Sequence, residues 1–253
     1  MEAKIREFIL SLGVDDVGFA AAGEYNNPKS YQITEILPKA KSVVVMAFKV
    51  LSNCESPALS PALNGYKDLE AFARNASYRA ARFLESHYKA KVVTIPNAGP
   101  IEIRKDRPAI ADFSHRHAAV AAGLGTFGRH NLVIHPEFGT RVNFASIITD
   151  IALEPTPKID RDLCIHCDLC VKNCPGNALE EPGCTNVPRC AKNSLPYGIA
   201  SNIGFWSELL AAPEETRAAM LRSEDYARLQ QAANLGNLYM CFNCMKSCPV
   251  GLK

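Results

Sequence analysis

Nine of the ten cysteines lie after residue 163, and their spacing indicates metal chemistry. The run CIHCDLCVKNCP, residues 164–175, has the spacing C-x2-C-x2-C-x3-C-P. With this spacing, three thiolates can hold one 4Fe–4S cluster while the fourth reaches a second cluster. A structural zinc site more often uses paired C-x2-C motifs separated by a spacer. The run therefore predicts iron–sulfur clusters.

A second cysteine run near the C-terminus supplies the partner that a four-cysteine run of this type needs. CFNCMKSCP, residues 241–249, has the spacing C-x2-C-x3-C-P, so one further ligand must come from upstream. Cys184 and Cys190 are the two choices, and we favour Cys190. The crossed pattern predicts two 4Fe–4S clusters: cluster A held by Cys164, Cys167, Cys170 and Cys248, and cluster B held by Cys174, Cys241, Cys244 and either Cys190 or Cys184.

A glycine-rich segment, GLGTFG at residues 123–128, also matches a chemical motif. It fits G-x-G-x-x-G, but it follows a predicted helix and precedes a predicted strand, the reverse of the order in a dinucleotide-binding site. We interpret it as the end of a helix followed by a tight turn. The polar residues on either side form a candidate ligand-binding cluster: His115, Arg116, His117, Arg129, His130 and Asn131.

The elements that must position these residues alternate between helix and strand over the first 150 residues. Apolar residues recurring at helical spacing, together with a capping serine before the third segment, predict helices over 3–12, 66–88 and 114–125. Runs rich in β-branched residues predict strands over 17–22, 42–50 and 91–96, with two more inside 131–150 around a PEFG turn. The strand at 42–50 is apolar throughout, which predicts burial on both faces.

A polar, proline-bearing stretch at residues 154–162 predicts a domain boundary. It separates an α/β domain of residues 1–153 from a cysteine-rich domain of residues 154–253. The second domain contains a predicted helical insert near residues 206–235. Exposed apolar faces of this insert could serve a homodimer.

Composition limits the classes of function and compartment. The 28 basic and 26 acidic side chains give a net charge of +2, which argues against a nucleic-acid-binding arm. The sequence holds no apolar run of about 18 residues that could span a membrane. Its N-terminus lacks the pattern of a signal peptide. We therefore expect a cytoplasmic protein whose clustered cysteines bind metal instead of forming disulfides.

Three segments in this order resemble epoxyqueuosine reductases and their relatives, the reductive dehalogenases. They are GLGTFGRHNLVIHPEFGTRVNFASIITD, CIHCDLCVKNCPGNAL and CFNCMKSCP. The resemblance implies a nitroreductase-like, corrinoid-binding α/β (α+β) domain, followed by a bacterial two-cluster ferredoxin-like module. It also implies base-off cobalamin between the domains. Electrons would come from a reduced ferredoxin or flavodoxin-type donor and pass through the clusters to cobalt.

The resemblance also assigns residues to the cofactor and to the chemistry. By match, the residues that border the corrinoid are Gly123, Leu124, Gly125, Gly128, Arg129, His130 and Asn131. Epoxyqueuosine reductases carry a proton-donating Asp upstream of the glycine turn. Its nearest counterpart here is Asp112, displaced by a few residues towards the turn. His115 and His117 are alternative donors, because histidine titrates near neutral pH.

Two departures from the family pattern shape the expected substrate. The chain stops four residues after its final Cys-Pro, where epoxyqueuosine reductases continue into a helical-repeat domain that helps hold tRNA. With a net charge of only +2, we expect nucleic acid not to be the partner. The expected function is reductive cleavage of a C–O or C–halogen bond in a small molecule. The alternatives are an electron-transfer protein and a corrinoid-reducing carrier, with reduction of epoxyqueuosine in tRNA ranked last.

Overall fold

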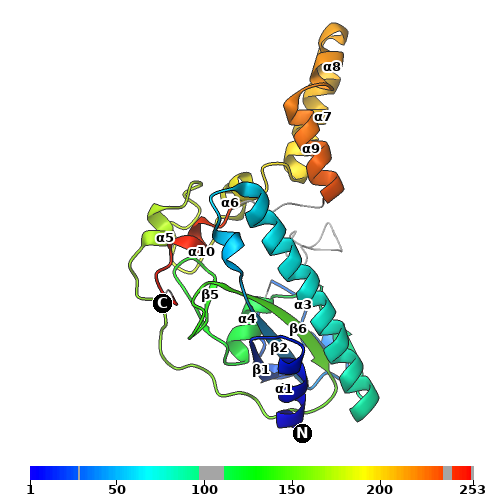
Figure 1. The fold of residues 1–253 in the computed structure, drawn as a ribbon, viewed down its shortest axis with the longest axis vertical. Coiled ribbons are helices and arrows are strands. Elements are labelled where there is room, and N and C mark those ends of the chain that lie inside the picture. The colour runs from blue at the N-terminus through cyan, green and yellow to red at the C-terminus, as the bar shows by residue number, and fades with distance from the viewer. Residues whose placement is uncertain (28, 97–110, 236–240, 252–253) are drawn as a thin grey trace.

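The computed structural model describes residues 1–27, 29–96, 111–235 and 241–251 (Figure 1). The first half of the chain folds around a four-stranded sheet. Its strands lie in the order β1 (Asp16–Ala21), β2 (Ser42–Lys49), β6 (Val142–Thr149) and β3 (Val92–Thr94), and every pairing is antiparallel. The prediction of a buried strand at 42–50 is confirmed, because β2 lies inside the sheet and all its residues except Lys49 are buried.

Helices cover both faces of the sheet and so make a mixed α and β domain of three layers. One core joins the sheet to α1 (Glu2–Ser11) and α3 (Leu59–Tyr88). A second core lies on the opposite face, under α2 (Ile33–Ile36) and α4 (His115–Ala121). Two short 3-10 turns, η1 (Ala22–Glu24) and η2 (Ser52–Glu55), lie after β1 and β2. Because the sheet is antiparallel, the domain is α+β and not a βαβ unit.

The long helix α3 begins seven residues before its predicted start at residue 66. Pro61 lies in its first turn, where a missing backbone N–H removes no helical hydrogen bond. The apolar face predicted for the helix is confirmed, with Leu69, Ala73, Ala76, Ala80 and Leu84 all buried.

The two strands expected on either side of the PEFG turn do not pair with each other. β5 (Val133–Ile134) pairs instead with β4 (Thr126–Phe127) in a small second sheet, and β6 joins the main sheet. The turn itself is closed by reciprocal backbone hydrogen bonds between His135 and Gly139. Gly139 has a φ of +57° and lies against the backbone of Val250. The C-terminal segment therefore packs against this turn.

The cysteine-rich half has little core of its own. Apart from the helical insert, its elements are α5 (Leu169–Lys172), α6 (Val187–Ser194) and α10 (Asn243–Ser247), and an extended segment from residue 151 leads to them. Phe242 and Met245, at α10, belong to the same core as α1 and α3. The ring of Phe242 lies 5.7 Å from that of Tyr66 in α3. The second cysteine run is thus packed directly onto the first domain.

The helical insert projects away from the rest of the molecule (Figure 1). It comprises α7 (Ile199–Ala211), α8 (Glu214–Met220) and α9 (Glu224–Leu235), so it begins earlier than the predicted residue 206. Phe205, Leu209 and Leu229 form a small core between α7 and α9. Several apolar side chains on α7 are exposed, and the homodimer expected through them stays a prediction. Among the described residues, no helix is both long and apolar enough to cross a membrane.

Candidate metal centre

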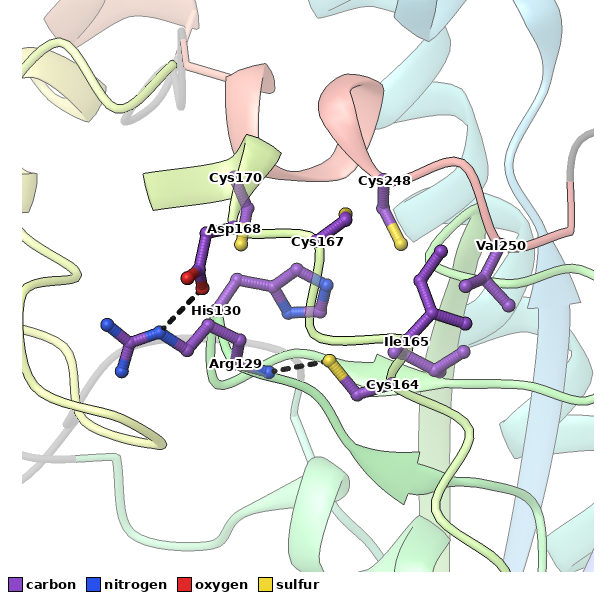
Figure 2. Close-up of a pocket in the computed structure, with 10 residues that line it drawn as sticks. Arg129, His130, Cys164, Ile165, Cys167, Asp168, Cys170, Cys248 and Val250 are labelled. Atoms are coloured by element: carbon purple, nitrogen blue, oxygen red, sulfur yellow. Dashed lines mark hydrogen bonds and ion pairs between the residues drawn. The ribbon is translucent and has the colours of Figure 1, made fainter. Parts of the chain in front are cut away.

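The four cysteines predicted to hold cluster A line one pocket, although they come from two distant parts of the chain. Cys164 lies on the extended segment before α5, and Cys248 lies just after α10. Figure 2 shows the four side chains around a common space, with Arg129, His130, Ile134, Ile165, Asp168 and Val250 completing the lining. His166 and Asp168 have positive φ angles of 51° and 56°, and these tight turns let the run wrap around the pocket. Four converging thiols are a donor set that fits an iron–sulfur cluster.

A second group of thiols surrounds Cys244. Burial, together with the neighbouring thiols of Cys241, Cys190 and Cys174, raises the pKa of Cys244 to about 12. Cys174 comes from the same run that supplies the first pocket, so the two groups are neighbours. Cys184 is exposed and is not among the groups that act on Cys244. This arrangement supports the choice of Cys190, from α6, as the upstream ligand.

Burial also keeps thiols of the first pocket protonated in the absence of metal. Burial raises the pKa of Cys170, and the nearby thiols of Cys164 and Cys248 contribute to this rise. It also raises the pKa of Cys248, although a hydrogen bond with Thr140 and the charge of Arg141 oppose the rise. Metal binding would displace these protons, because the thiolate is the ligand.

The C-terminal cysteine is held in place by a buried arginine that the sequence did not single out. Arg141 lies at the start of β6 and donates to Glu55 Oε1 at 2.6 Å and to the Lys246 carbonyl at 2.9 Å. It also donates to the carbonyl of Cys248. Glu55 precedes Arg141 by 86 residues, so no local motif could reveal the pair.

The glycine turn lies against the first cysteine pocket. The backbone N–H of Arg129 donates to Cys164 Sγ at 3.5 Å, and its side chain donates to Asp168 at 3.1 Å and to the Glu180 carbonyl at 3.0 Å. His130 also lines this pocket. Asn131 donates to Thr185 at 3.3 Å. These three residues, predicted to border a corrinoid, therefore lie between the first domain and the cysteine module.

The other residues predicted to border a corrinoid have packing roles in this structure. Leu124 is buried in the core beneath α4. Gly123 packs against the carbonyl of Pro157, and Gly125 against that of Ile134, so neither position has room for a side chain. Gly128 packs against the ring of His130. The interpretation of this segment as a helix end and tight turn agrees with the φ of +70° at Gly123.

The three predicted proton donors lie together at the beginning of α4. Both ring nitrogens of His115 are occupied: Nε2 donates to the Pro96 carbonyl at 3.3 Å, and Nδ1 lies 3.0 Å from Ser146 Oγ. Burial lowers the pKa of His115 to about 4, so its ring is neutral at neutral pH. His117 Nδ1 lies 2.7 Å from Ser114 Oγ, and burial together with Arg116 lowers its pKa. Asp112 is half-buried and lies two residues after a segment, residues 97–110, that is outside the described residues.

Comparison with known proteins agrees with the cysteine motifs. Residues 157–180 match a 4Fe-4S binding domain. The chain is 26% identical over 242 residues to the epoxyqueuosine reductase of Bacillus subtilis (strain 168), covering 81% of this chain and 59% of that protein. It is 23% identical over 283 residues to the epoxyqueuosine reductase of Staphylococcus aureus (strain NCTC 8325 / PS 47), covering 98% and 64%. The chain thus spans about three fifths of the length of the curated relatives it matches.

Solved structures show the same fold. A crystal structure of epoxyqueuosine reductase with an epoxyqueuosine-modified tRNA-Tyr stem loop superposes with a TM-score of 0.65 at 23% identity, covering 99% of this chain and 65% of that one. A reductive dehalogenase superposes with a TM-score of 0.56 at 20% identity, covering 92% and 36%. The resemblance to these two groups, predicted from three sequence segments, is confirmed.

Two expectations about the substrate are wrong. The chain was expected to act on a small molecule and not on nucleic acid, yet its curated relatives are epoxyqueuosine reductases and one solved neighbour holds a tRNA stem loop. The error came from reading a net charge of +2 as evidence against RNA. Net charge sums over the whole surface, whereas a nucleic acid responds to the charges of the surface that it contacts.

Proposed function

We propose that this chain is a cobalamin-dependent iron–sulfur reductase of the epoxyqueuosine reductase type, and that it reduces epoxyqueuosine in tRNA. The observation that carries the proposal is the pocket lined by Cys164, Cys167, Cys170 and Cys248, which faces a domain with the epoxyqueuosine reductase fold. The reaction consumes two electrons and two protons and removes the epoxide oxygen as water. A protein that performs it needs an electron path, a proton donor and a place for the nucleoside.

The electron path is the pair of cysteine groups. Cluster A would be held by the four thiols of the first pocket. Cluster B would be held by Cys174, Cys190, Cys241 and Cys244, because the last of these lies among the other three. Cys170 and Cys174 belong to one short run, so the two clusters would be neighbours. Neighbouring clusters can pass single electrons from an external reductant towards the first domain.

Cobalamin would bind where the glycine turn meets the cysteine module. Arg129 supports this placement, because its Nη1 is buried and has no hydrogen-bond partner among the described residues. A polar group of the corrinoid could accept from it. Bound cobalamin supplies a strongly reducing cobalt centre, and the protein's own part is to bind, orient and protonate.

We assign the proton donation to Asp112. His115 is poorly suited, because both its nitrogens have partners and its low pKa leaves it without a second proton. His117 is engaged with Ser114 at the cap of α4. Asp112 lies at the same end of this helix. It is half-buried, as expected of a carboxyl group that is held by the protein and contacts a bound substrate.

The proposal is tested with anaerobically reconstituted protein, tRNA that carries epoxyqueuosine, cobalamin and a chemical reductant. We expect about eight iron atoms and one cobalt atom per chain, and conversion of the nucleoside detected by mass spectrometry of digested tRNA. Omission of cobalamin should abolish the conversion. Protein with full iron and cobalt that leaves the nucleoside unchanged would refute the proposed substrate. Full iron without cobalt would instead indicate an electron-transfer protein.

A further inference from the structure

The imidazole of His130 occupies an unusual position beside the first cysteine pocket. His130 lies in the loop between β4 and β5, is 3% exposed, and lines the same pocket as Cys164, Cys170 and Cys248. In Figure 2 its ring points into the space between the labelled cysteines. A buried polar ring in this place needs a hydrogen-bond partner, because burying an unpaired donor is unfavourable.

Only one of its two nitrogens has a partner among the residues that the structure describes. The backbone N–H of Leu132 donates to Nδ1 at 3.0 Å, so Nδ1 is an acceptor and the ring proton resides on Nε2. Nε2 is buried and has no hydrogen-bond partner within the described residues. The ring therefore presents an N–H donor whose acceptor is not a protein group of the described chain.

The loop is built to keep the ring in this orientation. The backbone N–H of Gly128 donates to the Leu132 carbonyl at 2.8 Å, and that of Asn131 donates to the Gly128 carbonyl at 2.9 Å. A Cβ atom at residue 128 would lie 2.6 Å from Cε1 of His130 and 3.1 Å from Nε2. Glycine at this position thus makes room for the ring. The neighbouring backbone N–H of Arg129 already donates to Cys164 Sγ.

We propose that His130 donates a hydrogen bond from Nε2 to a sulfur atom of cluster A and thereby raises the reduction potential of that cluster. The proposal rests on the cluster assigned above to Cys164, Cys167, Cys170 and Cys248. Hydrogen bonds to the sulfur atoms are one of the determinants of cluster potential. A donor stabilises the reduced cluster more, because reduction adds negative charge to the sulfur atoms. The hydrogen bond from His130 therefore makes cluster A easier to reduce.

Two substitutions test the effect of the Nε2 hydrogen-bond donor separately from the other contacts of the His130 ring. In His130→Asn the shorter amide can still accept from the Leu132 N–H but does not reach the Nε2 position. In His130→Gln the amide nitrogen can reach that position and restore a donor. His87, exposed on α3, gives the matched control His87→Asn. The readouts are iron and sulfide content, and the potentials of both clusters from a redox titration followed by electron paramagnetic resonance.

We expect full iron in all variants and a lower potential for one cluster in His130→Asn. A neutral hydrogen bond changes an equilibrium constant by about tenfold, which is a shift of about 59 mV for a one-electron couple. His130→Gln should restore most of the shift, and His87→Asn should leave both potentials unchanged. Iron lost from the Asn variant but kept by the Gln variant would also support a donor to the cluster.

Two results would overturn the proposal. One is full iron with wild-type potentials in His130→Asn. The other is iron lost from both His130 variants, which would make the residue necessary only for the shape of the loop. Both results differ from a failure of the proposed function, which would appear in the wild-type protein as missing iron or an unreduced nucleoside.

Discussion

Arg141 offers the sharpest test of how the two halves of the chain depend on each other. Its side chain is only 10% exposed and donates to Glu55, to Thr140 Oγ1 and to the carbonyls of Lys246 and Cys248. Replacement by Met keeps much of the side-chain volume and removes all four hydrogen bonds. The two carbonyls and the carboxylate of Glu55 are then left without this partner.

The size of the effect follows from these contacts. A hydrogen bond to a charged group contributes about 1.5–3 kcal/mol, but the four share one side chain and do not add fully. Removing one partner of a fully buried ion pair costs about 3–5 kcal/mol, and because the Glu55 side chain is 34% exposed, the loss here falls towards the lower end of that range. We expect Arg141→Met to lower the free energy of unfolding by an amount in this range. A loss of 3 kcal/mol weakens the docking of the C-terminal segment by roughly a hundredfold.

The assay combines urea unfolding followed by circular dichroism, under anaerobic conditions, with iron analysis of the reconstituted protein. Because Cys248 is the distant ligand in the proposed cluster A, we expect Arg141→Met to retain about four of eight iron atoms. Arg141→Lys keeps the charge but not the planar geometry, so its loss should be intermediate. Arg222→Met, at an exposed site near α8, is the control. Unchanged stability and iron content in Arg141→Met would refute the reasoning.

Two further predictions concern the ligand of cluster B and the proton donor. Cys190→Ser should remove about four iron atoms per chain while Cys184→Ser keeps the full content, and the opposite pattern in an iron assay would assign the ligand to Cys184. Asp112→Asn should slow reduction of the nucleoside by about a hundredfold or more, as expected for loss of a general acid, without changing bound iron or cobalt. Turnover equal to wild type in single-turnover measurements would remove Asp112 from the mechanism.

The motif at residues 164–175 could be read from the sequence because its ligands lie within a few residues of one another. Local spacing constrains local geometry, and the match of residues 157–180 to a 4Fe-4S binding domain agrees with it. The same is true of β2 and of the apolar face of α3, where periodic burial leaves a clear pattern. Boundaries were less accurate. The apolar periodicity used to predict α3 begins at residue 66, whereas the helix itself begins at Leu59, with Pro61 in its first turn.

Contacts between segments that are distant in sequence could not be predicted from local residue patterns. The PEFG turn predicted a hairpin, but β5 and β6 belong to different sheets, and the C-terminal segment packs against Gly139 in the turn between them. The substrate class was also misjudged, because net charge contains no information about where the charges lie.

The cysteine spacing established that this chain carries iron–sulfur chemistry, and the order of its motifs indicated the family it resembles. The folded structure showed which groups lie together. Arg141 contacts Glu55 and the Cys248 carbonyl, and His130 lines the thiol pocket with a ring nitrogen, Nε2, that has no partner in the described part of the chain. The physical reason is the separation in sequence between the residues that meet. Ligands a few residues apart are set by backbone geometry, whereas a contact across 86 residues exists only after two cores have packed.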